Sequence, residues 1–234
     1  MTRRILRLLA AAAVGYAVSG AALASGNLVQ NGGFENTPVT ITTQFLNANV
    51  ANWSNSNIGE ALVTPNWYTN GYLFPNVGVA GPLPATSPAG GNFVFSDGDF
   101  MNSAITQTLT GLSPGQVYEL TFWQALAEDT EPGITIPGPV TGYWRVGFGT
   151  SVQNSAFMTG DGTTNTISPW AQQTMFFTAQ TATQVLSFFS VGTGDPPLVF
   201  LDGISLAAVP EPDTLALLVA GAGLLFVRAR RRRR

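Results

Sequence analysis

The chain has 234 residues, of which 45% are hydrophobic and only 10% charged, which suits one domain with a hydrophobic core and short appendages. The sequence contains no cysteine and no histidine, which excludes disulfides, thiol or histidine catalysis and histidine-bound zinc. Between Ser25 and Val209 one arginine, Arg145, stands against eleven acidic residues, so this part has a net charge of −10 and nucleic acid is not expected as a partner.

The first 24 residues are predicted to be a secretory signal peptide. Three arginines precede an apolar stretch over residues 8–18, and Ala22-Leu23-Ala24 supplies the small-x-small pattern that signal peptidase cleaves. Cleavage after Ala24 is therefore expected. The alternative is an uncleaved N-terminal anchor helix.

The segment over residues 37–91 is rich in Asn, Pro and Gly and is predicted to form one or two strands with long loops. Within it, Trp67, Tyr68 and Tyr72 lie among polar residues that include several asparagines. Aromatic rings stack on the C–H faces of sugars, and asparagine side chains hydrogen-bond sugar hydroxyls. These three aromatic residues are therefore candidate sugar contacts. The alternative is that they cover one edge of the fold.

From residue 92 onward, apolar and polar residues alternate with a period of two, which predicts β-strands. In the segment 117–126, for example, Tyr118, Leu120 and Phe122 share one face. Other predicted strands, separated by turns rich in glycine and proline, cover residues 142–149, 174–179, 183–191 and 198–209. Because no apolar stripe of helical period appears, residues 25–208 are predicted to form an all-β domain, an antiparallel β-sandwich.

Asp202 is a candidate metal ligand. It has the parity of the apolar residues two and four positions before and after it, so it is predicted to face the core. A buried carboxylate needs compensation, which a metal ion, backbone N–H groups or Arg145 could supply. Oxygen ligands of this kind favour Ca²⁺. The alternative is a hydrogen-bonded carboxylate that closes the ends of the strands.

Arg145 is predicted to lie on the opposite face of its strand from Trp144, either paired with an acidic residue or in contact with a ligand. No catalytic residue is predicted. The composition leaves a carboxylate pair of the glycosidase kind, and nothing in the sequence brings two carboxylates together across a cleft.

The C-terminal segment contains an uncharged run over residues 214–227, followed by arginines. At 1.5 Å per residue the run spans about 21 Å, less than the ~30 Å hydrocarbon core of a membrane. It is therefore predicted to be a short, weak transmembrane helix whose arginines stay in the cytoplasm. A basic tail that binds nucleic acid is the alternative, but an exported protein meets little nucleic acid.

The order Val209-Pro210-Glu211-Pro212, apolar helix and terminal arginines resembles the PEP-CTERM sorting signal of Gram-negative bacteria. The resemblance implies that residues 209–234 are read and cleaved by a membrane-embedded exosortase. The protein would then be anchored in the inner membrane only transiently and would pass to the cell surface or the exopolysaccharide matrix.

The domain itself resembles the galactose-binding-like jelly roll of many carbohydrate-binding modules. Similarity is carried by the segments 27–35, 105–118 and 201–206, which look like its opening strand, central hairpin and last strand. Related jelly rolls hold a structural calcium between the first and last strands, and Glu35 and Asp202 stand at the matching positions. The resemblance therefore implies Ca²⁺ as a cofactor, bound by these carboxylates and backbone carbonyls.

Together these features predict an exported, non-catalytic protein of the surface or matrix, with polysaccharide as its candidate ligand and a contribution to biofilm or exopolysaccharide as its candidate role. Two alternatives remain open at this point. One is a glycan hydrolase that uses two carboxylates, and the other is a purely structural matrix protein.

Overall fold

The computed structural model describes residues 26–36, 50–55, 62–64, 72–74, 77–79, 87–99, 104–130, 139–160, 168–194 and 197–210, together with 221, 222 and 228. The chain divides into two units, of which Ser25–Val209 is the β-domain and Met1–Ala24 with Pro210–Arg234 is the other. The predicted signal peptide lies outside the described residues. So does the predicted apolar helix over 214–227, apart from the helical residues Gly221 and Ala222.

Within the described ranges, no helix combines the length and the apolar character that crossing a membrane requires. The described part of the β-domain consists of strands, turns and irregular segments. Its thirteen strands are β1 (Ser54–Asn55), β2 (Leu62–Thr64), β3 (Tyr72–Phe74), β4 (Val77–Val79), β5 (Phe93–Asp97), β6 (Ile105–Thr110), β7 (Val117–Thr130), β8 (Val140–Phe148), β9 (Ser151–Asn154), β10 (Met158–Gly160), β11 (Ala171–Thr178), β12 (Thr183–Thr193) and β13 (Pro197–Ala208).

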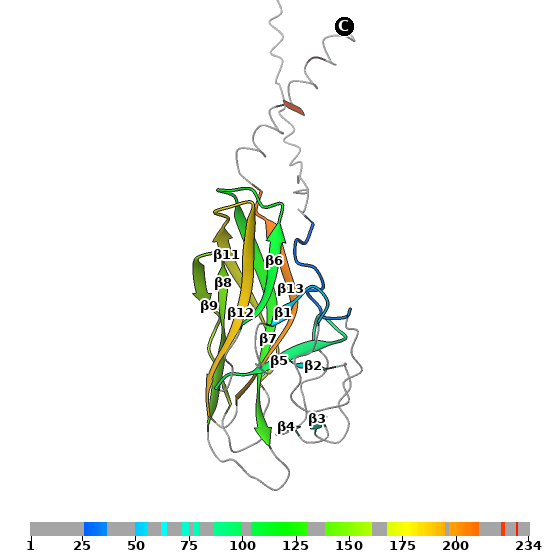
Figure 1. Cartoon of the computed structure of the whole chain (residues 1–234), viewed down its shortest axis with the longest axis vertical. Coiled ribbons are helices and arrows are strands. Elements are labelled where there is room, and N and C mark those ends of the chain that lie inside the picture. The colour runs from blue at the N-terminus through cyan, green and yellow to red at the C-terminus, as the bar shows by residue number, and fades with distance from the viewer. Residues whose placement is uncertain are drawn as a thin grey trace, which may run out of the picture. The chain divides into compact units, whose positions relative to one another are not determined.

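The strands form two antiparallel sheets (Figure 1). Sheet A has the order β1-β6-β12-β8-β10, with β9 also paired to β8, and sheet B has the order β2-β5-β13-β7-β4-β3, with β11 also paired to β7. From β5 to β8 and again from β11 to β13, successive strands alternate between the sheets, so that β5-β13-β7-β11 faces β6-β12-β8-β9. This is the strand order of a double Greek-key jelly roll, and it confirms the predicted antiparallel β-sandwich.

The alternation read from the sequence explains why these segments become strands. In β7, Tyr118, Leu120 and Phe122 are buried, whereas Glu119 between them is exposed. All five predicted strands are present, and each extends beyond its predicted bounds at one end, most of all β7, which continues to Thr130. A strand with one buried face and one wet face is what an antiparallel sandwich requires.

The hydrophobic core lies between the two sheets, where the inward rows of side chains meet. Trp144 of β8 is fully buried there, and its indole N–H donates to the carbonyl oxygen of Phe200 at 3.0 Å. Its ring meets that of Phe188 edge to face, with centroids 6.1 Å apart. Burying each large apolar side chain of this kind contributes about 1.5–3 kcal/mol to folding. Across the sheets, the hydroxyls of Ser96 and Ser190 lie 2.7 Å apart.

The expectation that Asp202 faces this core is wrong, although its side chain is fully buried. The pairing of β13 with β7 shifts between Asp202 and Ser205, and Gly203 within the shift has a φ of 58°. This β-bulge reverses the alternation, because one extra residue turns every later side chain to the other face. Val199 and Leu201 before the bulge belong to the core between the sheets. Asp202 therefore points to the outer face of sheet B.

Candidate functional site

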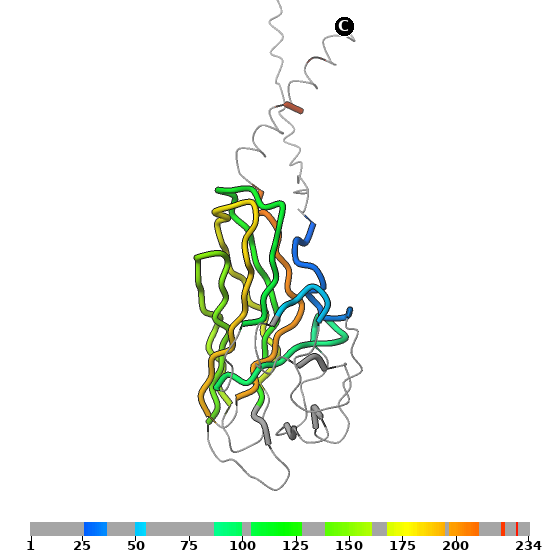
Figure 2. Tube along the Cα trace, viewed as in Figure 1, coloured from blue at the N-terminus to red at the C-terminus, as the bar shows by residue number. Residues whose placement is uncertain are grey.

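Asp202 is covered by the segment 26–36, which runs beside β13 (Figure 2). The amide of Leu28 donates to the carbonyl oxygen of Leu206, and the amide of Ile204 donates to that of Gly32, both at 2.9 Å. A Cβ on Gly32 would overlap the Ile204 carbonyl group, so only glycine allows the segment to come this close to the bulge. The contact at Gly32 brings the next residues over Asp202.

Glu35 follows in the same segment and is held at the start of β5. The backbone N–H of Asn92 donates to Glu35 Oε1 at 2.7 Å. Gly91 has a φ of 64°, and the Glu35 carboxylate occupies the space that a Cβ on Gly91 would fill. On the other side, the Cβ that Gly33 lacks would lie 3.9 Å from both Glu35 Cγ and Asp202 Oδ1. The structure thus brings the side chains of Glu35 and Asp202 close to each other beside Gly33.

Burial raises the pKa of Asp202 from 3.8 to about 7. Hydrogen bonds from the Ser87 side chain and from the Gly203 backbone N–H act in the opposite direction, and the charge of Glu35 adds to the rise. The Gly203 N–H donates to Oδ1 at 2.6 Å, while the buried Oδ2 has no hydrogen-bond partner in the described part of the chain. An ionised carboxylate in this position is unfavourable unless a cation compensates it.

The residues present fit a bound calcium ion in their chemistry. A buried carboxylate oxygen without a partner lies beside a second carboxyl group, and hard oxygen donors are those that Ca²⁺ prefers. Among the described residues, no cluster of three acidic side chains exists. A calcium ion here would therefore need backbone carbonyls as further ligands, as the resemblance to jelly rolls also implies.

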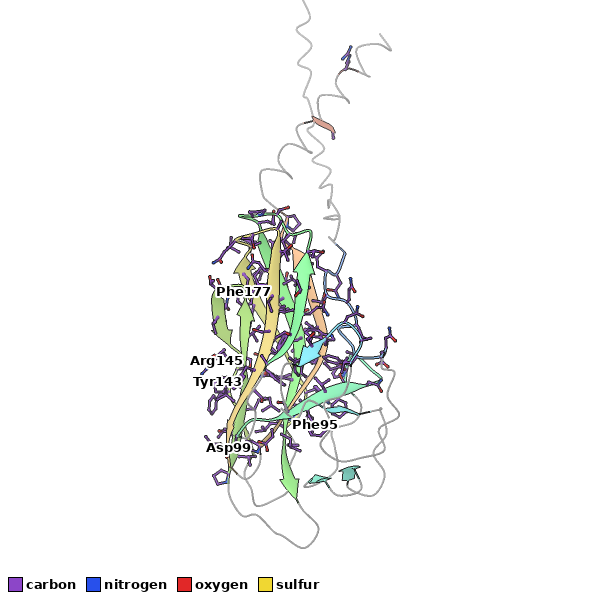
Figure 3. The ribbon with its side chains drawn as sticks, in the orientation of Figure 1. Phe95, Asp99, Tyr143, Arg145 and Phe177 are labelled. Atoms are coloured by element: carbon purple, nitrogen blue, oxygen red, sulfur yellow. The ribbon has the colours of Figure 1, made fainter. Side chains whose placement is uncertain are left out.

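The second candidate site surrounds Arg145 on the outer face of sheet A. Arg145 is exposed, and the pairing of the strands places Phe189 of β12 on one side of it and Asn154 of β9 on the other. Tyr143 lies two residues earlier on the same face of β8, and Figure 3 shows both side chains on the same side of that strand. The predicted position of Arg145, opposite Trp144, is confirmed.

A stacked aromatic pair, one ring half-buried and the other exposed, lies next to Arg145. The rings of Tyr143 and Phe157 are stacked, with centroids 5.2 Å apart and planes 30° apart, and Phe157 is 63% exposed. Sequence reasoning missed both residues. The alternation of β8 already placed Tyr143 beside Arg145, but Phe157 lies between strands β9 and β10, where no periodic pattern indicates its neighbours.

The three loop aromatics predicted as sugar contacts cannot be placed beside this pair. Trp67 and Tyr68 lie outside the described residues. Tyr72 begins β3, which pairs with β4 in sheet B, but its side chain is also outside the described part of the chain. Their predicted role stays a prediction.

The sorting motif starts at the edge of the folded domain. Val209 follows directly after β13, and its N–H donates to the carbonyl oxygen of Val117 at 2.8 Å. Its own carbonyl oxygen accepts a hydrogen bond from Gln116 Nε2 at 2.6 Å. Pro210 is exposed, whereas Glu211 and Pro212 lie outside the described residues. No flexible linker therefore separates the last strand from the Pro-Glu-Pro sequence.

Several solved structures are similar to this chain at low sequence identity. TmCBM61 in complex with β-1,4-galactotriose is 16% identical, with a TM-score of 0.41 over 79% of this chain and 100% of that chain. The CBM22-1 xylan-binding domain of Paenibacillus barcinonensis Xyn10C is 14% identical, with a TM-score of 0.43 over 80% and 97%. The CBM22-1–GH10 modules of Clostridium thermocellum Xyn10B with xylohexaose are 10% identical, with a TM-score of 0.41 over 80% and 29%.

A search of curated proteins found no significant match to the chain. The family of the PEP-CTERM protein-sorting motif matches residues 208–234, which begin at the last residue of β13. The match agrees with the Val-Pro-Glu-Pro sequence, the apolar run and the terminal arginines, and it implies processing by an exosortase. The chain therefore carries a C-terminal PEP-CTERM sorting motif and is an exported protein sorted to the cell envelope.

Proposed function

We propose that this protein is a non-catalytic component of the surface or exopolysaccharide matrix of a Gram-negative bacterium. Its jelly-roll domain binds polysaccharide on the outer face of sheet A, and an exosortase removes its C-terminal tail. The observation that carries the proposal is the stack of the half-buried Tyr143 and the exposed Phe157 beside Arg145.

A large aromatic ring as exposed as that of Phe157, stacked on a half-buried tyrosine, offers an apolar surface to a ligand, because covering the ring would be favourable. A sugar ring offers an apolar C–H face that fits such a platform. Its hydroxyl groups need hydrogen-bonding partners, and the exposed side chains of Asn154 and Arg145 lie on the same face. An open sheet face also suits a long polymer better than a closed cavity would.

We expect the substitutions Tyr143→Ala and Phe157→Ala each to weaken polysaccharide binding about fivefold to tenfold, since one aromatic contact contributes about 1–1.5 kcal/mol. The measurement is isothermal titration of the folded protein with soluble arabinoxylan, galactan, polygalacturonate and alginate. Phe176→Ala is the matched control, because Phe176 is 54% exposed but belongs to β11 of sheet B. Equal losses for Phe176→Ala, or no binding by the unchanged protein to any of the four polymers, would refute the proposed face.

The same titrations test the alternative of a hydrolase. A carboxylate-dependent enzyme would release reducing sugar from one of the polymers, and a single Asp or Glu substitution would abolish that release. A structural matrix protein would show neither binding nor release. Binding without release is the expected result.

We also propose a structural role for calcium, held by Glu35 and Asp202 at the Gly33 junction. The support is Asp202 Oδ2, which has no hydrogen-bond partner among the described residues and lies beside the carboxyl group of Glu35. A bound divalent ion would keep both groups ionised and would fasten the segment 26–36 to β13.

Processing by the exosortase gives a further prediction. Because both backbone polar groups of Val209 are hydrogen-bonded to the domain, we expect the mature protein to retain Val209 and to lose the terminal arginines. Intact-mass measurement of the protein recovered from the surface of a host that makes an exosortase gives the new C-terminus. An intact arginine tail on exported protein would contradict processing, and an end before Val209 would contradict protection by the fold.

A further inference from the structure

The acidic residues of the domain are distributed unequally between its two sheets. Five of the eleven lie in strands β5, β7 and β13 of sheet B: Asp97, Glu119, Glu128, Asp129 and Asp202. None of the six strands of sheet A, as the structure describes them, contains Asp or Glu. The one arginine between Ser25 and Val209 lies in β8 of sheet A. The outer face of sheet A thus carries the one arginine of a strongly acidic domain.

Arg145 itself is available to a ligand. It is exposed, and within the described part of the chain no acidic side chain forms an ion pair with it. Its two neighbours across the sheet, Phe189 of β12 and Asn154 of β9, are both uncharged.

A guanidinium group that makes no ion pair with any described residue, beside a stacking platform, suits a carboxylate better than a neutral hydroxyl. Its planar fork can donate two parallel hydrogen bonds to one carboxylate, and these are stronger and more directional than bonds to neutral acceptors. A neutral glycan would use Tyr143 and Phe157 but would leave this donor set only partly engaged. A uronic acid presents a carboxylate on the rim of the same ring whose C–H face stacks.

We propose that the outer face of sheet A is selective for acidic polysaccharides, with a uronate carboxylate paired to Arg145 while a sugar ring stacks on Tyr143 and Phe157. The inference rests on the proposed polysaccharide binding and adds the class of polymer. The net charge of −10 between Ser25 and Val209 opposes a polyanion at long range, but salt screens that repulsion beyond about 8 Å. The local charge at Arg145 then decides the preference.

The test compares two uronate polymers, polygalacturonate and alginate, with their carboxyl-reduced forms, which keep the backbone and lose the charge. At physiological salt, we expect the protein to bind at least one acidic polymer on the order of fivefold more tightly than its reduced form, as one exposed ion pair allows. Arg145→Gln should remove the preference, so that the acidic polymer and its reduced form bind equally tightly. Arg145→Lys should keep part of it, because lysine retains the charge but not the fork.

The outcomes distinguish acidic selectivity from the polysaccharide binding on which it rests. Equal binding of acidic and reduced polymers, or a preference that survives in Arg145→Gln, overturns acidic selectivity and leaves polysaccharide binding standing. Absence of binding to every polymer, the neutral ones included, overturns both. Because Arg145 is exposed, its variants are expected to keep the melting temperature of the unchanged protein, which the same samples verify.

Discussion

Raising the pH from 4 to 8 in the absence of calcium is expected to lower the free energy of unfolding by about 4 kcal/mol through Asp202 alone. In the unfolded chain this carboxyl group loses its proton near its ordinary pKa of 3.8, whereas in the folded domain burial raises its pKa to about 7. Its contribution to stability is therefore complete below pH 3.8 and is lost as the pH rises through about 7. Chemical denaturation at a series of pH values, with excess EDTA, measures the loss.

Calcium should reverse this loss at neutral and higher pH, because the ion binds the ionised carboxylate and stabilises the folded state by mass action. Asp202→Asn should flatten the pH dependence and remove the response to calcium. Asp99→Asn is the matched control, since Asp99 is exposed in the turn after β5. A melting temperature that excess EDTA leaves unchanged at pH 8 would eliminate the calcium site. A pH profile identical in the unchanged protein and Asp202→Asn would show that Asp202 does not titrate as its burial implies.

Much of the fold was predictable because its strands have one buried and one wet face. In β8, the alternation of Trp144, Arg145 and Val146 was sufficient to assign the inner and outer faces. In antiparallel sandwiches, local patterns of this kind indicate which face of a strand is buried, since each sheet packs on one side only. The turn residues between the strands supplied the boundaries, as at Ser113-Pro114-Gly115, which lies between β6 and β7.

The bulge at Gly203 shows where local patterns fail. Every second residue from Leu198 to Leu206, Asp202 apart, is apolar, which predicts one continuous face, but one extra residue reverses the faces in the middle of β13. On the outer face of sheet B, Phe200 packs on Phe93 in an apolar cluster. Both faces of this part of β13 are therefore buried. With both faces apolar, the sequence cannot report on which side Asp202 lies. A glycine within a strand is the one visible indication of a bulge.

The two candidate sites were predictable to different extents. Glu35 and Asp202 lie far apart in the sequence, and the resemblance to jelly rolls alone brought them together before the structure did. Arg145 was found because it is the single cation of its region. Its neighbours Phe189 and Asn154 could not be predicted, because the register of three strands decides which residues flank Arg145. Pairing over long sequence separations is information that local periodicity does not contain.

Gly32→Ala is expected to lower the free energy of unfolding by about 2–3 kcal/mol, the upper part of the range for single substitutions. The added Cβ would overlap the carbonyl oxygen of Ile204, which is backbone within β13 and cannot move aside cheaply. The segment 26–36 must then lift, and the 2.9 Å hydrogen bond from the Ile204 amide to the Gly32 carbonyl oxygen is lost with it. Urea denaturation at pH 8, with and without calcium, measures the change.

The loss should be greater with calcium than without it, because lifting the segment also moves Glu35 away from Asp202 and removes the extra stability that the ion supplies. Gly26→Ala is the matched control in the same segment, since a Cβ at Gly26 has no atom within 4 Å. It is expected to change stability by less than about 0.5 kcal/mol. A Gly32→Ala protein as stable as this control, or one that responds to calcium like the unchanged protein, would show that the approach of the segment to the bulge does not hold the carboxylate pair together.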